Sequence, residues 1–361
     1  MILHVVQANY GDCFLIETGE GDQRRFILID GGITDTYTNH LKPSLDKLVG
    51  PQGTLDLAVL SHIDNDHALG MLAFFRDLQK KRAQNNPSIQ IRSFWHNALQ
   101  KTASPRALWF DRLKTSLAQG WVKLPLDIVA TEGEKGFREG DALQELAGFL
   151  KVPINFGNGK ALVQADWKED VAIGQVRIKL LGPSSVNLKR LERKWREWLT
   201  ANMKARGEGK PMSDRTEPNL SSIQLLLTDE NGKRVLMTGD GLGKHLIEGA
   251  RAAGLIGENG KMRVDILKVP HHGSIRNINK AFFETIQADT YVISADGRDG
   301  NPEYQTLEWI VDCAKADGRP IRLVLTNKPP SVVEFLNKRP PEQNGYTPVF
   351  LEESHSLAIE V

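Results

Sequence analysis

Short apolar runs separated by turn residues open the chain, and they predict a sheet. The segments 2–7, 13–18 and 25–30 are strand-like, and the sequences NYGD and GEGDQ supply turn chemistry between them. This order predicts a meander at the start of the sheet. The run LDLAVLS at 55–61 predicts a buried strand, and the periodic segment 68–82 after it predicts a helix that ends in a basic turn.

The remaining pattern mixes strand hairpins with strand-helix-strand units. Further strand-like segments lie at 88–97, 174–183, 221–240 (a hairpin through DENGK), 265–273, 290–296 and 321–327. Helical segments lie at 105–120, 245–254, 280–287 and 307–318. The pattern is typical of mixed sheets with helices outside, an α/β (α+β) fold.

Bulk composition narrows the class of protein. The 361 residues carry a net charge of +1, which argues against a globally basic nucleic-acid coat. The N-terminal sequence has no basic and apolar leader, and we find no run of 18 apolar residues, so we expect a cytoplasmic protein that does not enter a membrane. In that compartment Cys13 and Cys313 are expected to be reduced thiols.

The sequence SHIDNDHALG concentrates metal-ligand chemistry at one strand-to-helix turn. His62, Asp64, Asp66 and His67 follow the strand that ends at Ser61. Imidazole nitrogen and carboxylate oxygen suit zinc or manganese, and the carboxyl edge of a sheet is where α/β proteins build sites. The alternative is an ordinary surface turn with a capping aspartate.

Two further strand ends carry the same chemistry. Asp240 ends the strand VLMTGD, and His271 with His272 ends the strand ILKVPHH. Each alone is compatible with a turn aspartate or a capped loop, but three such strand ends favour a metal site. Adjacent histidines cannot easily both face one ion. We therefore expect His272 to be the ligand and His271 to contact substrate or protonate the leaving group.

One basic segment departs from the rhythm of strands and helices. Residues 186–215 contain nine Lys or Arg against four Asp or Glu. A solvated helix that caps the core is one interpretation, and a basic lid over a phosphate-bearing substrate is the other.

Several sequence motifs along this chain resemble those of the metallo-β-lactamase fold hydrolases. The resemblance runs in order through QANYGDCFLI, FILIDGG, SHIDNDHALG, VLMTGD, LKVPHHGS and YVISADG. LKVPHHGS and TGD are similar to the branch that contains the C-terminal hydrolase domain of the competence DNA-uptake channel. That branch also carries aspartate where the general motif has its second histidine, here Asp64. The resemblance implies a four-layer αββα sandwich, with 1–361 as a single domain and a basic helical insertion around 186–215.

The resemblance also implies roles for the residues. His62 and Asp64 would hold a first divalent ion, Asp66 and His67 a second, and Asp240 would bridge the two, with His272 completing the second site. His96 fills the place of the family's histidine between the first motif and the bridging aspartate, although a structural histidine is the alternative. Asp30 would orient a metal-binding histidine. The branch has a Tyr-Gly-His-Pro string where this chain has DGNPEY, so a histidine contact is missing there.

Two divalent cations, zinc or alternatively manganese, favour hydrolysis. Our leading hypothesis is a phosphodiesterase or nuclease in which Asp66 also orients the attacking hydroxide and His271 acts on the leaving group. Its substrate would contain phosphate, with single-stranded nucleic acid and a protein partner as further expectations. The alternatives are a hydrolase of small esters, lactones or amides, and a non-catalytic scaffold of the same fold.

Overall fold

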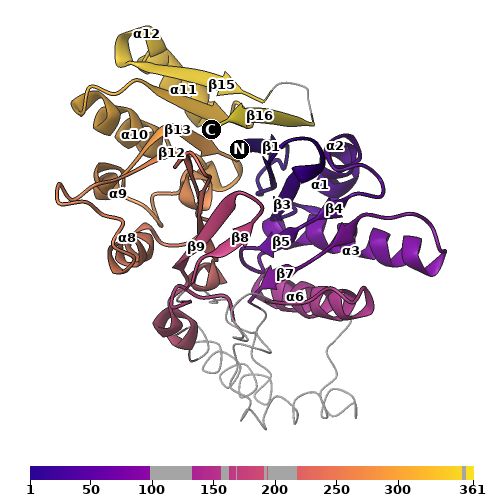
Figure 1. Cartoon of the computed structure of the whole chain (residues 1–361). Helices are drawn as coiled ribbons and strands as arrows, with labels where there is room; N and C mark the ends of the chain where they lie inside the picture. Colours follow the sequence, from indigo (N-terminus) through magenta and orange to yellow (C-terminus); the bar gives the residue numbers. More distant parts are fainter. Residues whose placement is uncertain (98–131, 156–161, 168, 191–192, 194–217, 352–354) are drawn as a thin grey trace, which may run out of the picture.

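The computed structural model describes all residues except 98–131, 156–161, 168, 191–192, 194–217 and 352–354. The helix expected at 105–120 lies outside the described residues, and so does most of the basic segment 186–215. Within the described part, the strands form two large sheets that lie between two groups of helices (Figure 1). This is the four-layer αββα arrangement that the resemblance implied.

The N-terminal sheet has the strand order β16-β1-β2-β3-β5-β7. Its strands are β1 (Ile2–Val6), β2 (Phe14–Thr18), β3 (Arg25–Ile29), β5 (Leu57–Leu60), β7 (Phe94–His96) and β16 (Ser356–Glu360). The first three form the predicted antiparallel meander, whereas β3, β5 and β7 run parallel. The strand expected at 88–97 is split, because β6 (Gln90–Ile91) pairs with β4 (Thr54–Leu55) and β7 pairs with β5.

The C-terminal sheet has the order β15-β14-β13-β12-β11-β10-β9-β8. Its strands are β8 (Val171–Ile173), β9 (Val176–Gly182), β10 (Gln224–Thr228), β11 (Arg234–Met237), β12 (Met262–Lys268), β13 (Ile286–Ile293), β14 (Ile321–Leu325) and β15 (Tyr346–Phe350). The predicted hairpin is the antiparallel pair of β10 and β11, and the strands from β11 to β15 run parallel.

Helices cover the outer face of each sheet (Figure 1). On the N-terminal side they are α1 (Thr34–Thr36), the π-helix Tyr37–Leu41, α2 (Lys42–Leu48), α3 (Asn65–Ala83) and α6 (Glu132–Phe149). On the C-terminal side they are α8 (Gly243–Ala252), α9 (Lys280–Thr285), α10 (Tyr304–Ala316), α11 (Pro330–Lys338) and α12 (Pro341–Asn344). Short 3₁₀ turns lie at Gly21–Gln23, Pro218–Ser221, Pro270–Gly273 and Arg298–Gly300.

Alternation along the strands divides the core into three layers. Phe14 and Ile16 of β2 face the other sheet, while Leu15 between them faces α3. In β12, Ile266 packs between the sheets and Leu267 packs against the outer helices. Successive side chains of a strand point to opposite faces, so each sheet buries both of its faces. Both cysteines are buried free thiols.

The parallel strands set the position of the site. In the N-terminal sheet, β1, β3, β5 and β7 all end at one edge, and in the C-terminal sheet β11, β12, β13 and β14 do the same. The residues that follow those ends therefore gather in two neighbouring rows of loops. None of the described helices is long and apolar enough to cross a lipid bilayer.

Candidate metal centre

The first row of donors comes from the connection between β5 and α3. His62 follows the end of β5 and is buried. Asp64 stands at the N-cap of α3, with Asp66 and His67 in the first turn of that helix. The helix begins three residues earlier than the predicted segment 68–82, so the motif that the sequence placed before the helix partly lies on it. Negative charge in a first turn also complements the helix dipole.

Asp30 fixes the orientation of His67. His67 Nδ1 donates to Asp30 Oδ2 at 2.9 Å, and the same carboxylate accepts from the Ser61 amide and hydroxyl at 2.7 Å each. Asp30 adopts a left-handed backbone conformation, with φ of 58°, which is uncommon outside glycine. With Nδ1 held by Asp30, the Nε2 atom of His67 faces Asp240. This is the orienting contact that the resemblance implied for Asp30.

The second row comes from the C-terminal sheet. Asp240 follows β11 and is buried, and His272 lies in the turn after β12. His272 Nδ1 donates to the Ser294 carbonyl at 2.8 Å, so its Nε2 also faces the cluster. His271 and His272 both have positive φ, 47° and 54°. Such strained backbone persists where the surroundings hold it, and it gathers at functional sites.

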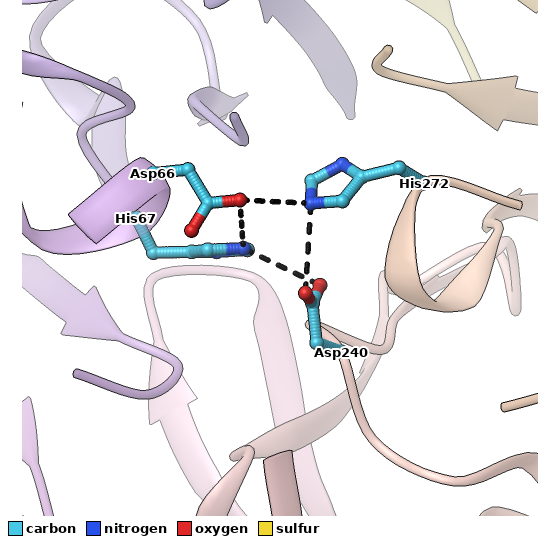
Figure 2. A group of neighbouring side chains, drawn as sticks. All are labelled: Asp66, His67, Asp240 and His272. Carbon is cyan, nitrogen blue, oxygen red and sulfur yellow. Dashed lines mark ion pairs between the residues drawn. The ribbon is translucent and has the colours of Figure 1, made fainter. Parts of the chain in front are cut away.

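Four donors from the two rows converge on one point. Figure 2 shows Asp66 and His67, from α3, facing Asp240 and His272, from the opposite sheet. His272 Nε2 lies 3.2 Å from Asp66 Oδ2 and 3.5 Å from Asp240 Oδ2. His67 Nε2 lies 3.3 Å from Asp240 Oδ1 and 3.8 Å from Asp66 Oδ2.

These residues fit a metal ion. Donors about 2.0–2.2 Å from a tetrahedral ion stand about 3.3–3.6 Å from one another, close to the separations in this cluster. Among the described residues, the inward-facing atoms Nε2 of His67, Nε2 of His272 and Oδ1 of Asp240 are buried without a hydrogen-bond partner. A buried polar atom without a partner costs free energy, and an ion held between these atoms would remove that cost.

A second group of donors adjoins the first through Asp240. His62 Nε2 lies 3.4 Å from Asp64 Oδ2 and 3.8 Å from Asp240 Oδ2. His271 Nε2 lies 3.6 Å from the same Asp240 oxygen, and its side chain is 27 % exposed. The two groups together are compatible with a dinuclear site.

The charges of the cluster reinforce one another. Burial opposes protonation of His67 and His272, but Asp240 and its neighbouring carboxylates outweigh burial and raise the pKa of both histidines, that of His272 to about 10. Burial likewise opposes ionisation of Asp66 and Asp240, but the facing histidines hold the pKa of each carboxyl below its usual range. Cations are therefore strongly favoured between these side chains, as protons or as metal ions.

His96 lies at the end of β7, where it pairs in register with Leu60. It is buried, and its ring stacks on Phe94 with centroids 5.4 Å apart. A side chain added at Gly140 of α6 would lie 3.5 Å from His96 Nε2, so α6 covers this ring. His96 is not one of the four residues that converge, which are Asp66, His67, Asp240 and His272. Its role as a ligand stays a prediction.

The sequence did not single out a buried ion pair beside the cluster. Lys268 Nζ forms an ion pair with Asp12, lies 3.6 Å from Asp240 Oδ1 and donates to the Gly239 carbonyl at 3.1 Å. Burial opposes the charge on Lys268, but Asp12 and Asp240 outweigh it and raise the pKa of the ammonium. Asp12 Oδ1 also lies 3.5 Å from His272 Nδ1. The available signal was a lysine within the otherwise apolar string ILKV.

Comparisons with known proteins give a family match over the N-terminal part of the chain. Residues 6–84 match the family model described as "Metallo-beta-lactamase superfamily", a span that includes the whole His62–His67 turn but neither Asp240 nor His272. No curated protein matches the chain. Among solved structures, the chain is similar to one described as a new diphosphatase from the PhnP family, with 10% identity, a TM-score of 0.41, and coverage of 100% of this chain and 98% of that chain.

The family match over residues 6–84, the two facing sheets and the buried His/Asp cluster are together compatible with a metal-dependent hydrolase of the metallo-β-lactamase superfamily.

Proposed function

We propose that this chain is a metal-dependent hydrolase of the metallo-β-lactamase superfamily that cleaves phosphodiester bonds with two divalent cations, zinc or manganese. The observation that carries the proposal is the position of Asp240. One of its oxygens faces His67, while the other faces His62, His271 and His272. A carboxylate shared in this way suits two adjacent cations. Such a pair supplies activation of water and neutralises charge on a phosphoryl oxygen.

Ligand roles follow the two donor groups. Asp66, His67, Asp240 and His272 would hold one ion, and His62, Asp64 and Asp240 the other, with His96 as the further ligand that the family pattern implies. The abundance of carboxylates favours hard, oxygen-loving cations and a substrate whose reacting group is itself anionic. The strings TGD and LKVPHHGS, with their resemblance to a DNA-processing branch, further support a nucleic-acid substrate, single-stranded in our hypothesis.

Two side chains are suited to proton handling. Asp66 Oδ2 faces His272, so the other oxygen of this partly exposed carboxylate is available to orient attacking water. His271 is the more exposed of the two adjacent histidines, and its Nε2 lies close to Asp240 Oδ2. We assign His271 to protonation of the leaving group.

A substrate screen tests this function directly. Purified protein, supplied with zinc or manganese, should contain two ions per chain by elemental analysis. It should hydrolyse bis-p-nitrophenyl phosphate and a single-stranded oligonucleotide faster than p-nitrophenyl acetate or a lactone. The variant His67→Ala should lose this activity, while His40→Ala, which alters a histidine outside the cluster, should keep it.

The results also separate the alternatives. Hydrolysis of the acetate or lactone alone would replace our proposal with a small-molecule esterase. If correctly folded wild-type protein neither binds metal nor hydrolyses any of these substrates, a non-catalytic scaffold of the same fold would be favoured.

A further inference from the structure

Tyr10 lies beside the metal cluster because its loop packs directly on α3. The Asp12 amide donates to the Asp66 carbonyl at 3.2 Å. A side chain at Gly11 would come within 2.0 Å of that carbonyl oxygen, so only glycine permits the contact. Tyr10 is the next residue in the loop, and it is partly exposed. Its ring therefore lies at the rim of the cluster, on the side of Asp66.

The guanidinium of Arg298 lies on the ring of Tyr10, 3.6 Å from its centroid. Arg298 comes from the loop after β13. That loop is tied to the Tyr10 loop by the Ser294 hydroxyl, which donates to the Gly11 carbonyl at 2.5 Å. Asn327 Nδ2 also joins them, since it lies 3.0 Å from the Ala295 carbonyl and 3.3 Å from the Asn9 carbonyl. The stacked pair is thus positioned by two connected loops.

Arg298 also forms a side-chain hydrogen bond with Tyr10, and its guanidinium carries further N–H donors beyond that one. Arg298 is exposed and forms no ion pair with another residue that the structure describes, unlike Arg263 and Arg339, which pair with carboxylates. The nearby Asp296 carboxylate accepts from the Arg298 backbone amide at 2.9 Å, and Asp299 is exposed at the next position. A preorganised guanidinium offers parallel donors that match a phosphate.

We propose that Arg298, held by Tyr10, binds a phosphate of the substrate that neighbours the one being hydrolysed. The substrate class is then a phosphodiester with a second phosphate nearby, as in an oligonucleotide, and not an isolated diester. This inference rests on the proposed phosphodiesterase function and adds a specificity residue to it. Arg298 contacts the substrate, and Tyr10 acts through Arg298 as a positioning residue.

A matched pair of substrates tests the proposal. Both are p-nitrophenyl esters of thymidine 5′-phosphate, and only one carries a 3′-phosphate. The wild-type protein should prefer the 3′-phosphorylated ester. In Arg298→Ala this preference, taken as the ratio of the two kcat/KM values, should fall about tenfold through KM, because a hydrogen bond to a charged group is lost. Arg298→Lys should recover part of the preference, since a lysine supplies the charge but not the planar fork.

Tyr10 variants separate positioning from charge. Tyr10→Ala should lower the preference as Arg298→Ala does, whereas Tyr10→Phe, which keeps the ring face but loses the hydrogen bond to Arg298, should keep part of it. Arg177→Ala is the matched control. Arg177 is an exposed arginine at the start of β9, the end of that strand far from the metal cluster. Its removal should leave the hydrolysis of both substrates unchanged. Equal KM changes for the two substrates in Arg298→Ala would overturn the proposal.

Equilibrium binding distinguishes a failure of this inference from a failure of the proposed function. Calorimetry with thymidine 3′,5′-bisphosphate and with thymidine 5′-phosphate needs no turnover. Tighter binding of the bisphosphate that disappears in Arg298→Ala would support the phosphate site even in a protein that cleaves neither ester. Equal affinity of wild-type protein for the two nucleotides would reject the site, whatever the esters show.

Discussion

The two sheets supply the cluster in different ways. The N-terminal sheet delivers His62, Asp64, Asp66 and His67 from one turn, and it orients His67 through a side chain, Asp30. The C-terminal sheet needs two strand ends for Asp240 and His272, and it orients His272 through a backbone carbonyl. The donors of the first half are therefore close in sequence, and a mutation can remove the side chain that orients His67. In the second half the donors come from two separate strand ends, and the orientation of His272 depends on the backbone. The group of Asp66, His67, Asp240 and His272 takes donors from both halves.

Removal of a donor from either half should have the largest effect. Asp240→Ala and His67→Ala should each lower hydrolysis on the order of 10³-fold, because each removes a ligand and leaves the other half with an incomplete site. Circular dichroism should show a folded chain in both variants. Activity within a few-fold of wild type in one variant, with loss in the other, would show that a single half suffices.

Removal of the orienting side chain should have an intermediate effect. Asp30→Asn keeps the shape of the residue but weakens its hold on His67 Nδ1, so metal affinity should fall about 10–100-fold. In the C-terminal half, Ser294→Ala leaves the orienting carbonyl in place, and metal affinity should fall less than about tenfold. Calorimetric titration with zinc measures both. Similar losses in the two variants would remove the distinction between the halves.

The left-handed turn of the C-terminal half should be sensitive to glycine replacement. Gly273 has a φ of 87°, and an added Cβ would lie 2.9 Å from Pro302 Cβ. Gly273→Ala should lower the free energy of unfolding by about 2 kcal/mol, from backbone strain and this collision. Gly254→Ala is the control, since its φ is 68° but nothing lies within 4 Å of the added carbon. Its smaller loss, about 1 kcal/mol, isolates the strain. Equal losses in the two variants would mean that Pro302 moves aside, so that the collision costs no free energy of unfolding.

A pH dependence is also expected in the metal-free protein. The carboxylates raise the pKa of His272 from 6.5 to about 10 in the folded state. Their attraction to its charge stabilises the fold fully below about pH 6.5 and is lost as the pH rises toward about 10. The Tm of metal-free protein should therefore fall between these values, and it should fall less in His272→Asn. If the Tm of the wild-type protein and of His272→Asn changed identically with pH, the pH dependence would not come from the charge on His272.

The same division explains what the sequence predicted. The N-terminal meander, the strand before His62 and the helix of His67 were predicted because their signals are local alternation, turn residues and helical periodicity. The strand ends at Asp240 and His272 were also predicted, but their meeting with α3 was expected only from the family resemblance. A contact between segments that are distant in the chain leaves no periodic pattern in the sequence of either segment.

Other features needed the folded chain. The pairing of Lys268 with Asp12 joins residues from two different sheets, and the stacking of Arg298 on Tyr10 joins two loops. Tyr10 and Arg298 each look like an ordinary polar loop residue in the sequence. α6 was not predicted, although it covers His96. The register of β5 and β7 placed His96 beside Leu60, but it does not by itself bring His96 into the four-residue group.

The pairing of β1 with β16 has a consequence for synthesis on the ribosome. Residues Ile2–Val6 are made long before Ser356–Glu360, yet they lie side by side in register, Leu3 opposite Ile359. The nascent N-terminal sheet therefore presents the backbone N–H and C=O groups of β1 along an open edge until β16 has been made. A chain cut before residue 356 keeps the His62–His67 turn but leaves that edge exposed to other chains.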